Sequence, residues 1–216
     1  MANYRDIKGF KIANFESDPV ENVASWSAGG NLNTARRALA GGGTQTAGLA
    51  FGGYDTNLTG KTEEYNGSSW AEDGDLNTAR AALAGCGVIP AALAFGGGST
   101  TTEAVAEEYN GSSWTETGDL SNARDQLAGA GTQTAALAFG GAGVTASTEE
   151  FGGSSWTAGG NLNTARRYLA GFGLQTAAIG AGGAEPTISA KVEQYNGSSW
   201  TEVGDLNQAR YGLSGG

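Results

Sequence analysis

Short runs with apolar residues at alternate positions recur along the chain, and each run ends in glycines. Residues 37–43 (RALAGGG) and 47–53 (AGLAFGG) are examples. A hydrophobic period near two residues predicts β-strands. Residues 63–70 (EEYNGSSW) combine a polar strand, an Asn-Gly turn and a Trp-bearing strand, and Asn-Gly is the strongest short signal for a hairpin. These segments predict four antiparallel strands per unit. Residues 77–83 are the one stretch for which a short helix is an alternative.

The unit repeats along nearly the whole chain. Five tryptophans mark it at spacings of 44, 44, 42 and 44 residues: Trp26, Trp70, Trp114, Trp156 and Trp200. Four short strands in about 44 residues are typical of a β-propeller blade. A helical repeat is disfavoured because the glycine pairs would break its helices. The sequence therefore predicts an all-β protein, a β-propeller of four-stranded antiparallel blades.

The amino-acid sequence of the repeat resembles two groups of proteins. A glycine pair after a hydrophobic strand, Tyr and Trp at fixed offsets, and an L-x-x-A-R step resemble kelch motifs over residues 20–216. The phrases NLNTAR-x-x-LAG and EEYNGSSW are also similar to repeat proteins of marine bacteriophage virions, and the opening MANYRDIKGFKI is similar to the N-termini of tail-fibre-type proteins. The resemblance implies a kelch-like propeller domain at 20–216 and an N-terminal attachment segment at 1–19.

The number of blades is predicted to be about five. Four complete repeats lie between Trp26 and Trp200. A fifth blade would be composite, combining residues 210–216 with N-terminal strands at residues 10–15 and 20–26. Such closure would remove exposed sheet edges. A longer or open assembly, with an incomplete fifth blade, remains the alternative.

The charge and composition limit the classes of partner. The 216 residues have a formal net charge of −10 and no histidine. An acidic surface repels phosphate backbones, so no nucleic-acid partner is expected. No apolar run reaches the length of a signal peptide or a membrane span. We therefore expect that the protein is made in a host cytoplasm and does not insert into a membrane.

Two sets of recurring residues are predicted to be structural. The first set is Arg36, Arg80, Arg124, Arg166 and Arg210. We expect these to pair with acidic residues of the E-E-Y strand, such as Glu64, Glu108 or Glu150; a ring of anion-binding groups is the alternative. The second set is the five tryptophans, which are expected to pack between blades, with sugar-stacking platforms as the alternative.

The segments that differ between copies are the candidate ligand-binding loops. They occupy residues 53–61, 97–106, 141–148 and 183–191. Loops on a rigid scaffold commonly hold binding specificity, and Thr, Ser and Asp suit hydrogen bonds to polyhydroxylated ligands. Drift in unselected turns is the alternative. The candidate residues are Tyr54, Asp55, Thr56, Asn57, Ser99, Thr100, Thr101, Thr145, Ser147, Glu185 and Thr187.

An enzyme is not expected. Without histidine the chain has no Ser-His-Asp triad, no imidazole metal site and no base for Cys86. The paired glutamates recur in register, which indicates architecture and not a hydrolytic carboxylate pair. We therefore predict no catalytic residues, no metal and no cofactor.

The resemblance to phage proteins implies a structural protein of the phage virion, tail-fibre or tail-associated. Its expected partners are other virion proteins, bound through the N-terminal segment, and a glycan or protein of the host surface. Tail-fibre-type proteins are often trimers, which suggests a homo-oligomer. Two alternatives stay open: a soluble lectin with one sugar per blade, and a general protein-interaction propeller of a bacterial cell.

Overall fold

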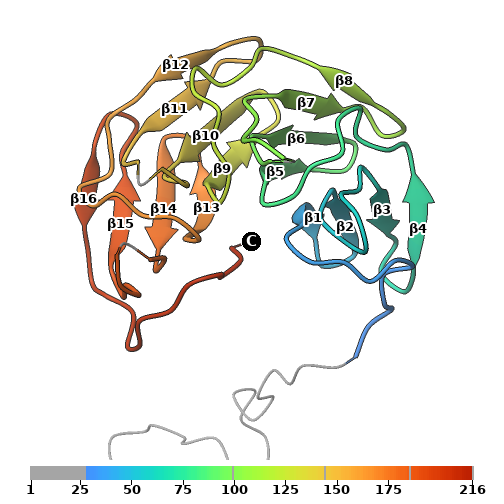
Figure 1. Cartoon of the computed structure of the whole chain (residues 1–216), viewed down its shortest axis with the longest axis horizontal. Coiled ribbons are helices and arrows are strands. Elements are labelled where there is room, and N and C mark those ends of the chain that lie inside the picture. The colour runs from blue at the N-terminus through green and yellow to red at the C-terminus, as the bar shows by residue number, and fades with distance from the viewer. Residues whose placement is uncertain (1–27, 99, 144, 185, 216) are drawn as a thin grey trace, which may run out of the picture.

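The protein is all-β in the computed structural model, which describes residues 28–98, 100–143, 145–184 and 186–215. The strands form four antiparallel sheets of four strands each, and no described residue is helical. The sheets stand side by side around a common centre, each with its first strand innermost (Figure 1). The predicted four-stranded antiparallel unit is confirmed. Residues 77–83 form bends and an isolated bridge in place of a helix.

Some predictions fall on residues outside this description. They are the attachment segment 1–19, the candidate strands at 10–15 and 20–26, Trp26, Ser99 and Glu185.

The four sheets follow one another in the chain. The first contains β1 (Ala40–Thr44), β2 (Ala47–Phe51), β3 (Thr62–Tyr65) and β4 (Trp70–Asp73). The second contains β5 (Ala84–Val88), β6 (Ala91–Phe95), β7 (Ala106–Tyr109) and β8 (Trp114–Glu116). The third contains β9 (Ala128–Thr132), β10 (Ala135–Phe139), β11 (Thr148–Phe151) and β12 (Trp156–Ala158). The fourth contains β13 (Ala170–Leu174), β14 (Ala177–Ala181), β15 (Val192–Tyr195) and β16 (Trp200–Glu202).

The innermost strands β1, β5, β9 and β13 approach one another through glycine. A β-carbon on Gly171 would lie 2.5 Å from the carbonyl oxygen of Gly129, and one on Gly129 would lie 3.2 Å from that of Gly85. Because any side chain there would collide with the neighbouring backbone, close approach requires glycine. The four strands line an axial cavity of about 310 Å³, where Cys86 also lies.

Buried aromatic pairs hold neighbouring sheets together. Phe51 of the first sheet contacts Trp114 of the second, with ring centroids 4.8 Å apart. The next two junctions repeat this pair, as Phe95 with Trp156 at 5.0 Å and Phe139 with Trp200 at 4.7 Å. Such pairs stabilise the junction through buried area and favourable ring geometry. In the fourth sheet, Ala181 stands at the position that the other sheets give to phenylalanine.

The indole N–H groups show where one junction differs from its neighbours. Trp114 Nε1 donates to Thr62 Oγ1 at 2.9 Å, and Trp200 Nε1 donates to Thr148 Oγ1 at 2.9 Å. At the junction between them, the buried Trp156 Nε1 has no partner among the described residues. Ala106 occupies the position of the two threonines there, so the acceptor is missing. An unpaired buried donor lowers stability.

Replacing Ala106 with Thr is expected to raise the free energy of unfolding by about 1–2 kcal/mol, because it supplies the acceptor that Trp156 lacks. Thr62 and Thr148 show that this position accommodates the side chain. Ala106→Val adds similar volume without the oxygen and is the matched control. Urea unfolding followed by tryptophan fluorescence measures the difference; equal stability of the Thr and Val variants would contradict the explanation.

Each repeated arginine that precedes a described sheet forms a buried ion pair, but with a different glutamate from the one expected. The expected partners were Glu64, Glu108 and Glu150. The observed pairs are Arg36–Glu63 at 2.6 Å, Arg80–Glu107, Arg124–Glu149 at 2.9 Å and Arg166–Glu193 at 2.7 Å. Their side chains are at most 4% exposed. Adjacent residues of a strand face opposite sides, so only the first glutamate of each pair faces the arginine.

The second glutamate serves the junction with the next sheet. Glu64 accepts a hydrogen bond from the Tyr109 hydroxyl at 2.8 Å, and Glu150 accepts one from the Tyr195 hydroxyl. Burial and the adjacent Glu150 carboxylate raise the pKa of Tyr195 to about 12, so this tyrosine stays a hydrogen-bond donor at neutral pH. Phe151 replaces the tyrosine in the third sheet and gives Glu108 no such partner.

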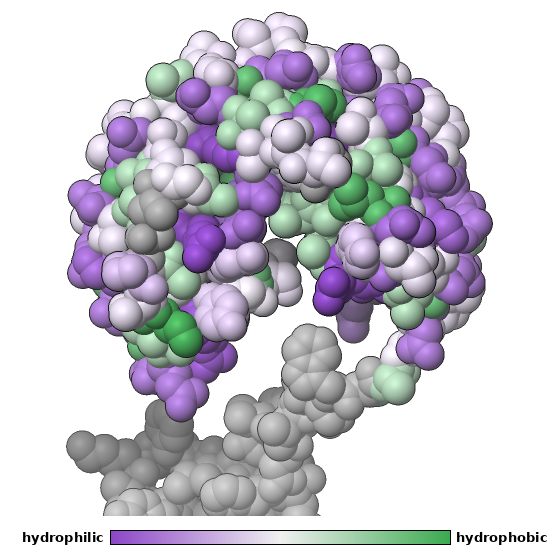
Figure 2. Space-filling model, in the orientation of Figure 1, coloured by the Kyte–Doolittle hydropathy of each residue, from purple (hydrophilic) through white to green (hydrophobic). Residues whose placement is uncertain are grey.

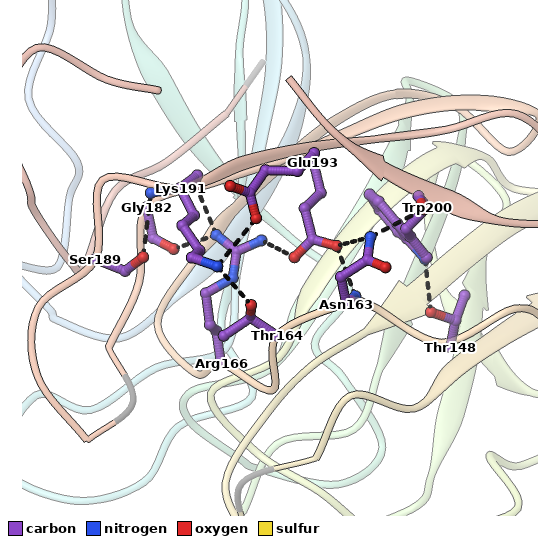
Figure 3. A network of polar contacts seen from close by, with 10 residues as sticks. Thr148, Asn163, Thr164, Arg166, Gly182, Ser189, Lys191, Glu193 and Trp200 are labelled. Atoms are coloured by element: carbon purple, nitrogen blue, oxygen red, sulfur yellow. Dashed lines mark hydrogen bonds and ion pairs between the residues drawn. The ribbon is translucent and has the colours of Figure 1, made fainter. Parts of the chain in front are cut away.

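Figure 3 shows the polar network around the ion pair of the fourth sheet. Glu193 accepts from Arg166 through one oxygen and from the side chain and backbone N–H of Asn163 through the other. Asn163 also donates to the Trp200 carbonyl at 2.9 Å. The network therefore fixes the segment that leads into the innermost strand against the two outer strands of the same sheet.

A second connection between sheets uses only backbone atoms. Four residues that precede the innermost strands have left-handed backbone angles, with φ between 53° and 56°: Ala38, Ala82, Gln126 and Tyr168. The last three of these each donate their N–H to the carbonyl of the counterpart in the preceding unit, and Ala38 accepts the first bond. The three bonds measure 2.8 to 2.9 Å. We call this chain of bonds the backbone belt, and it links all four sheets around the axis.

The residues after β16 extend the belt beyond the fourth sheet. Gly212 N donates to the Tyr168 carbonyl at 2.9 Å, and Gly183 N donates to the Arg210 carbonyl as Gly141 N does to that of Arg166. A β-carbon on Gly215 would lie 2.5 Å from the Gly171 carbonyl oxygen, which repeats the contact between inner strands. The C-terminus therefore lies near the centre (Figure 1), where the innermost strand of a next sheet would stand.

Candidate functional site

One end of the axis brings together the parts of the repeat that vary. The β2–β3 loop and its counterparts lie beside the two residues that follow each repeated arginine. Isolated bridges between Arg37 and Tyr54, and between Arg167 and Ala184, join these segments. The variable pairs are Arg37-Ala38, Ala81-Ala82, Asp125-Gln126, Arg167-Tyr168 and Tyr211-Gly212. We call this end the variable face.

The first two predicted loops meet in one cleft of about 600 Å³. Its lining includes Arg37, Tyr54, Thr100, Thr101 and Asp125. The Arg37 guanidinium lies over the Tyr54 ring, 5.1 Å from its centroid. A cation over an aromatic face is attracted by the ring quadrupole, so this pair is held in place at the surface. The cleft thus offers hydroxyls and both signs of charge to a ligand.

The next residues of the first loop stabilise their own turn. Asp55 Oδ1 accepts hydrogen bonds from the backbone N–H groups of Thr56 and Asn57. These bonds favour the ionised form and lower the pKa of Asp55. The carboxylate therefore fixes the loop that carries Tyr54.

The two candidate hydroxyls of the third predicted loop bond within the loop itself. Thr145 Oγ1 donates to Ser147 Oγ at 2.7 Å and accepts from Ser147 N at 3.0 Å. The Ser147 carbonyl accepts from the Arg124 guanidinium at 2.9 Å. These groups are engaged within the loop and its sheet, so the geometry assigns Thr145 and Ser147 to loop structure.

The fourth predicted loop forms a second cleft, of about 700 Å³, with residues that the sequence did not indicate. Thr187 lies there beside Arg167, Tyr168, Ile188 and Tyr211. The Tyr168 and Tyr211 rings are 6.1 Å apart and tilted by 56°. The Arg167 guanidinium is 5.6 Å from the centroid of the Tyr168 ring. We call this the tyrosine cleft.

The missed residues had a signal in the sequence. In NTAR-x-x-LAG the two positions marked x change from copy to copy while their neighbours stay the same. The candidate residues were chosen only from the longer loops that vary, so these two positions were not included. The backbone belt explains why these two positions can vary, because it holds them by main-chain atoms.

Unpaired positive charge is concentrated on the variable face. Of the nine lysines and arginines in the described residues, six form ion pairs with glutamate. The three without an ion pair among the described residues are Arg37, Arg167 and Arg210. Arg37 and Arg167 belong to the two clefts. On the molecular side seen in Figure 2, hydrophilic residues predominate along the outer rim and hydrophobic residues occur in small separate patches.

The one cysteine in the axial cavity is chemically quiet. Burial raises the pKa of the Cys86 thiol to about 12, so it is a thiol and not a thiolate at neutral pH. Its Sγ lies 3.4 Å from the Thr132 carbonyl oxygen. Within the described residues, no group of three or more Cys, Asp or Glu side chains is placed to hold a metal ion, and no helix is long and apolar enough to cross a membrane.

Comparison with known proteins gives no relative: neither the protein-family models nor the curated proteins match the chain. The variable face is therefore interpreted from its own geometry.

Proposed function

We propose that the four sheets are blades of a five-bladed, kelch-like β-propeller whose fifth blade is composite. The segment after β16 supports this, because it extends the backbone belt and lies against β13 where a fifth inner strand would stand. Arg210 also supports it. This residue matches the four arginines that form buried ion pairs, yet it is exposed and has no ion pair among the described residues.

The residues before Trp26 have the length that the rest of this blade requires. In the first sheet, Trp70 follows Ala47 at the start of β2 by 23 residues, and in the third sheet Trp156 follows Ala135 by 21 residues. Residues 1–26 can therefore supply a second and a third strand, and a fourth strand would begin at Trp26. By analogy with the other junctions, Trp26 would pack against Ala181.

We infer that the propeller is a non-enzymatic binding module of a phage virion, carried on the tail. The observation that carries the binding role is the variable face, where changing side chains gather on a framework of repeated buried contacts. Recognition residues are commonly placed in this way, on variable loops fixed by a rigid scaffold. The virion setting rests on the similarity of the repeat wording and of residues 1–12 to phage proteins. The partners would be other virion proteins and a glycan or protein of the host surface.

Antibodies raised against the chain are expected to label the tails of purified phage particles in electron micrographs, and to reduce adsorption of those particles to host cells. The same antibodies pre-absorbed with the purified chain are the control. Recovery of the chain only from the soluble fraction of cells, with unlabelled particles, would contradict the virion assignment and favour a cellular interaction propeller.

A soluble lectin with one sugar in each blade is the second candidate. The two clefts favour it in part, because both lie between neighbouring units on the variable face. However, the residues that line them differ between units, and the Thr145 and Ser147 hydroxyls of the third loop bond to each other. The variable face therefore supports fewer binding sites than blades, which native mass spectrometry of a ligand complex can count.

A further inference from the structure

We propose that the tyrosine cleft binds a carboxylate-bearing sugar residue of a glycan, with Tyr168 and Tyr211 against the sugar ring and Arg167 on the carboxylate. The inference rests on the proposed function and deepens it, because it names the ligand class of one site on the variable face.

The two tyrosine rings give the cleft a surface that fits a sugar ring. They are 39% and 56% exposed, and their tilt of 56° makes an open corner and not a closed stack. The electron-rich ring faces attract the C–H groups on the apolar face of a pyranose. Ile188 and Thr187 on the opposite loop add an apolar contact and a hydroxyl. Ligand sites of this kind combine apolar walls with a few polar groups that fix orientation.

The backbone at Tyr168 indicates that this side chain serves something other than stability. Its φ is 55°, a left-handed conformation that is unfavourable for a bulky side chain. The same position of the belt has alanine in two units, glutamine in the third unit and glycine after β16. A ring that is partly exposed gains little from burial here. A bulky residue held in a strained backbone at a cleft points to function.

The charge of the cleft selects an acidic sugar over a neutral one. Arg167 is exposed and has no ion pair among the described residues; within the described residues its guanidinium makes one long hydrogen bond, 3.4 Å, to Gln126 Oε1. The remaining N–H donors of its guanidinium match a carboxylate in bidentate geometry. The first cleft differs, because Asp125 lies there together with Arg37.

The probe for this proposal is tetragalacturonate, compared with its methyl ester in isothermal titration calorimetry of the full chain. The ester retains the sugar rings and removes the charge. We expect the acid to bind roughly tenfold or more tightly than the ester, since a hydrogen-bonded charge supplies that difference. Arg167→Gln should abolish this preference. Tyr211→Ala and Tyr168→Asn should weaken both ligands, and asparagine tolerates the left-handed backbone, so the belt is retained.

Arg37→Gln is the matched control. It removes the equivalent exposed arginine of the first unit, which also lies over a tyrosine, and should leave the affinity for tetragalacturonate unchanged. Equal affinity for acid and ester, retained preference in Arg167→Gln, or an equal loss in Arg37→Gln would each overturn the proposal. Absence of binding to tetragalacturonate would overturn it as well. The virion role would survive any of these results if particles are labelled and their adsorption is blocked.

Discussion

Glu107→Ala is expected to lower the free energy of unfolding by about 3–5 kcal/mol, because it leaves the Arg80 guanidinium buried without a counter-charge. Both side chains are fully buried. Glu107 also accepts hydrogen bonds from the backbone and side chain of Asn77, so the variant frees several donors at once. Urea denaturation followed by circular dichroism measures the loss.

Glu108→Ala is the control for that prediction. This residue is the next one in β7 and faces the opposite side of the sheet. At the junction between the second and third sheets Phe151 offers no hydroxyl to it, unlike Tyr109 and its equivalent Tyr195 at the other junctions. We expect a change within about 0.5 kcal/mol. Equal losses in the free energy of unfolding for the two variants would show that the buried ion pair stabilises the fold no more than the neighbouring Glu108 does.

The second large effect is expected from deletion of residues 1–26. If they complete the fifth blade, their removal leaves residues 204–215 docked only on the fourth sheet. We expect the amides of this segment to exchange hydrogen at nearly the rate of a fraying terminus, because few contacts would hold it closed. In the full chain the Gly212 amide, bonded to the Tyr168 carbonyl, should be protected. Hydrogen exchange with mass spectrometry compares the two chains.

Replacing residues 1 and 2 with Gly-Ser is the control for the deletion. By the spacing of the other units the second strand of the composite blade would begin no earlier than residue 3, so protection of 204–215 should be retained. Unchanged protection after the full deletion would favour an open or longer assembly over a composite blade. It would leave the four observed sheets and the variable face as they are described.

The alternation of residues in each strand was sufficient to predict the sheets, because the strand period and the Asn-Gly turns are local properties of the chain. The partner of each arginine was not predictable to the residue. Glu63 and Glu64 differ by one position, and only the register of β3 against β2 decides which faces Arg36. Pairing across about 30 residues depends on tertiary structure, and a strand shifted by one residue would exchange the two glutamates.

Dependence on tertiary structure also limited what the composition of the candidate loops could indicate. Loop composition indicated Tyr54, Thr100 and Thr101, which share a cleft. It could not distinguish them from Thr145 and Ser147, whose hydroxyls bond within their own loop. The tyrosine cleft depends on contacts between consecutive units. A sequence shows that two positions vary, but the backbone belt is what places them side by side.

The backbone belt also has a practical consequence. Its bonds use main-chain atoms alone, so side chains at positions 38, 82, 126 and 168 can be exchanged without removing a bond between sheets. The limit is set by φ near 55°, which favours glycine and asparagine and disfavours β-branched residues. A combinatorial library that randomises the preceding residue of each pair, and restricts the belt residue itself to small or amide side chains, would turn this protein into a scaffold for selecting new binders.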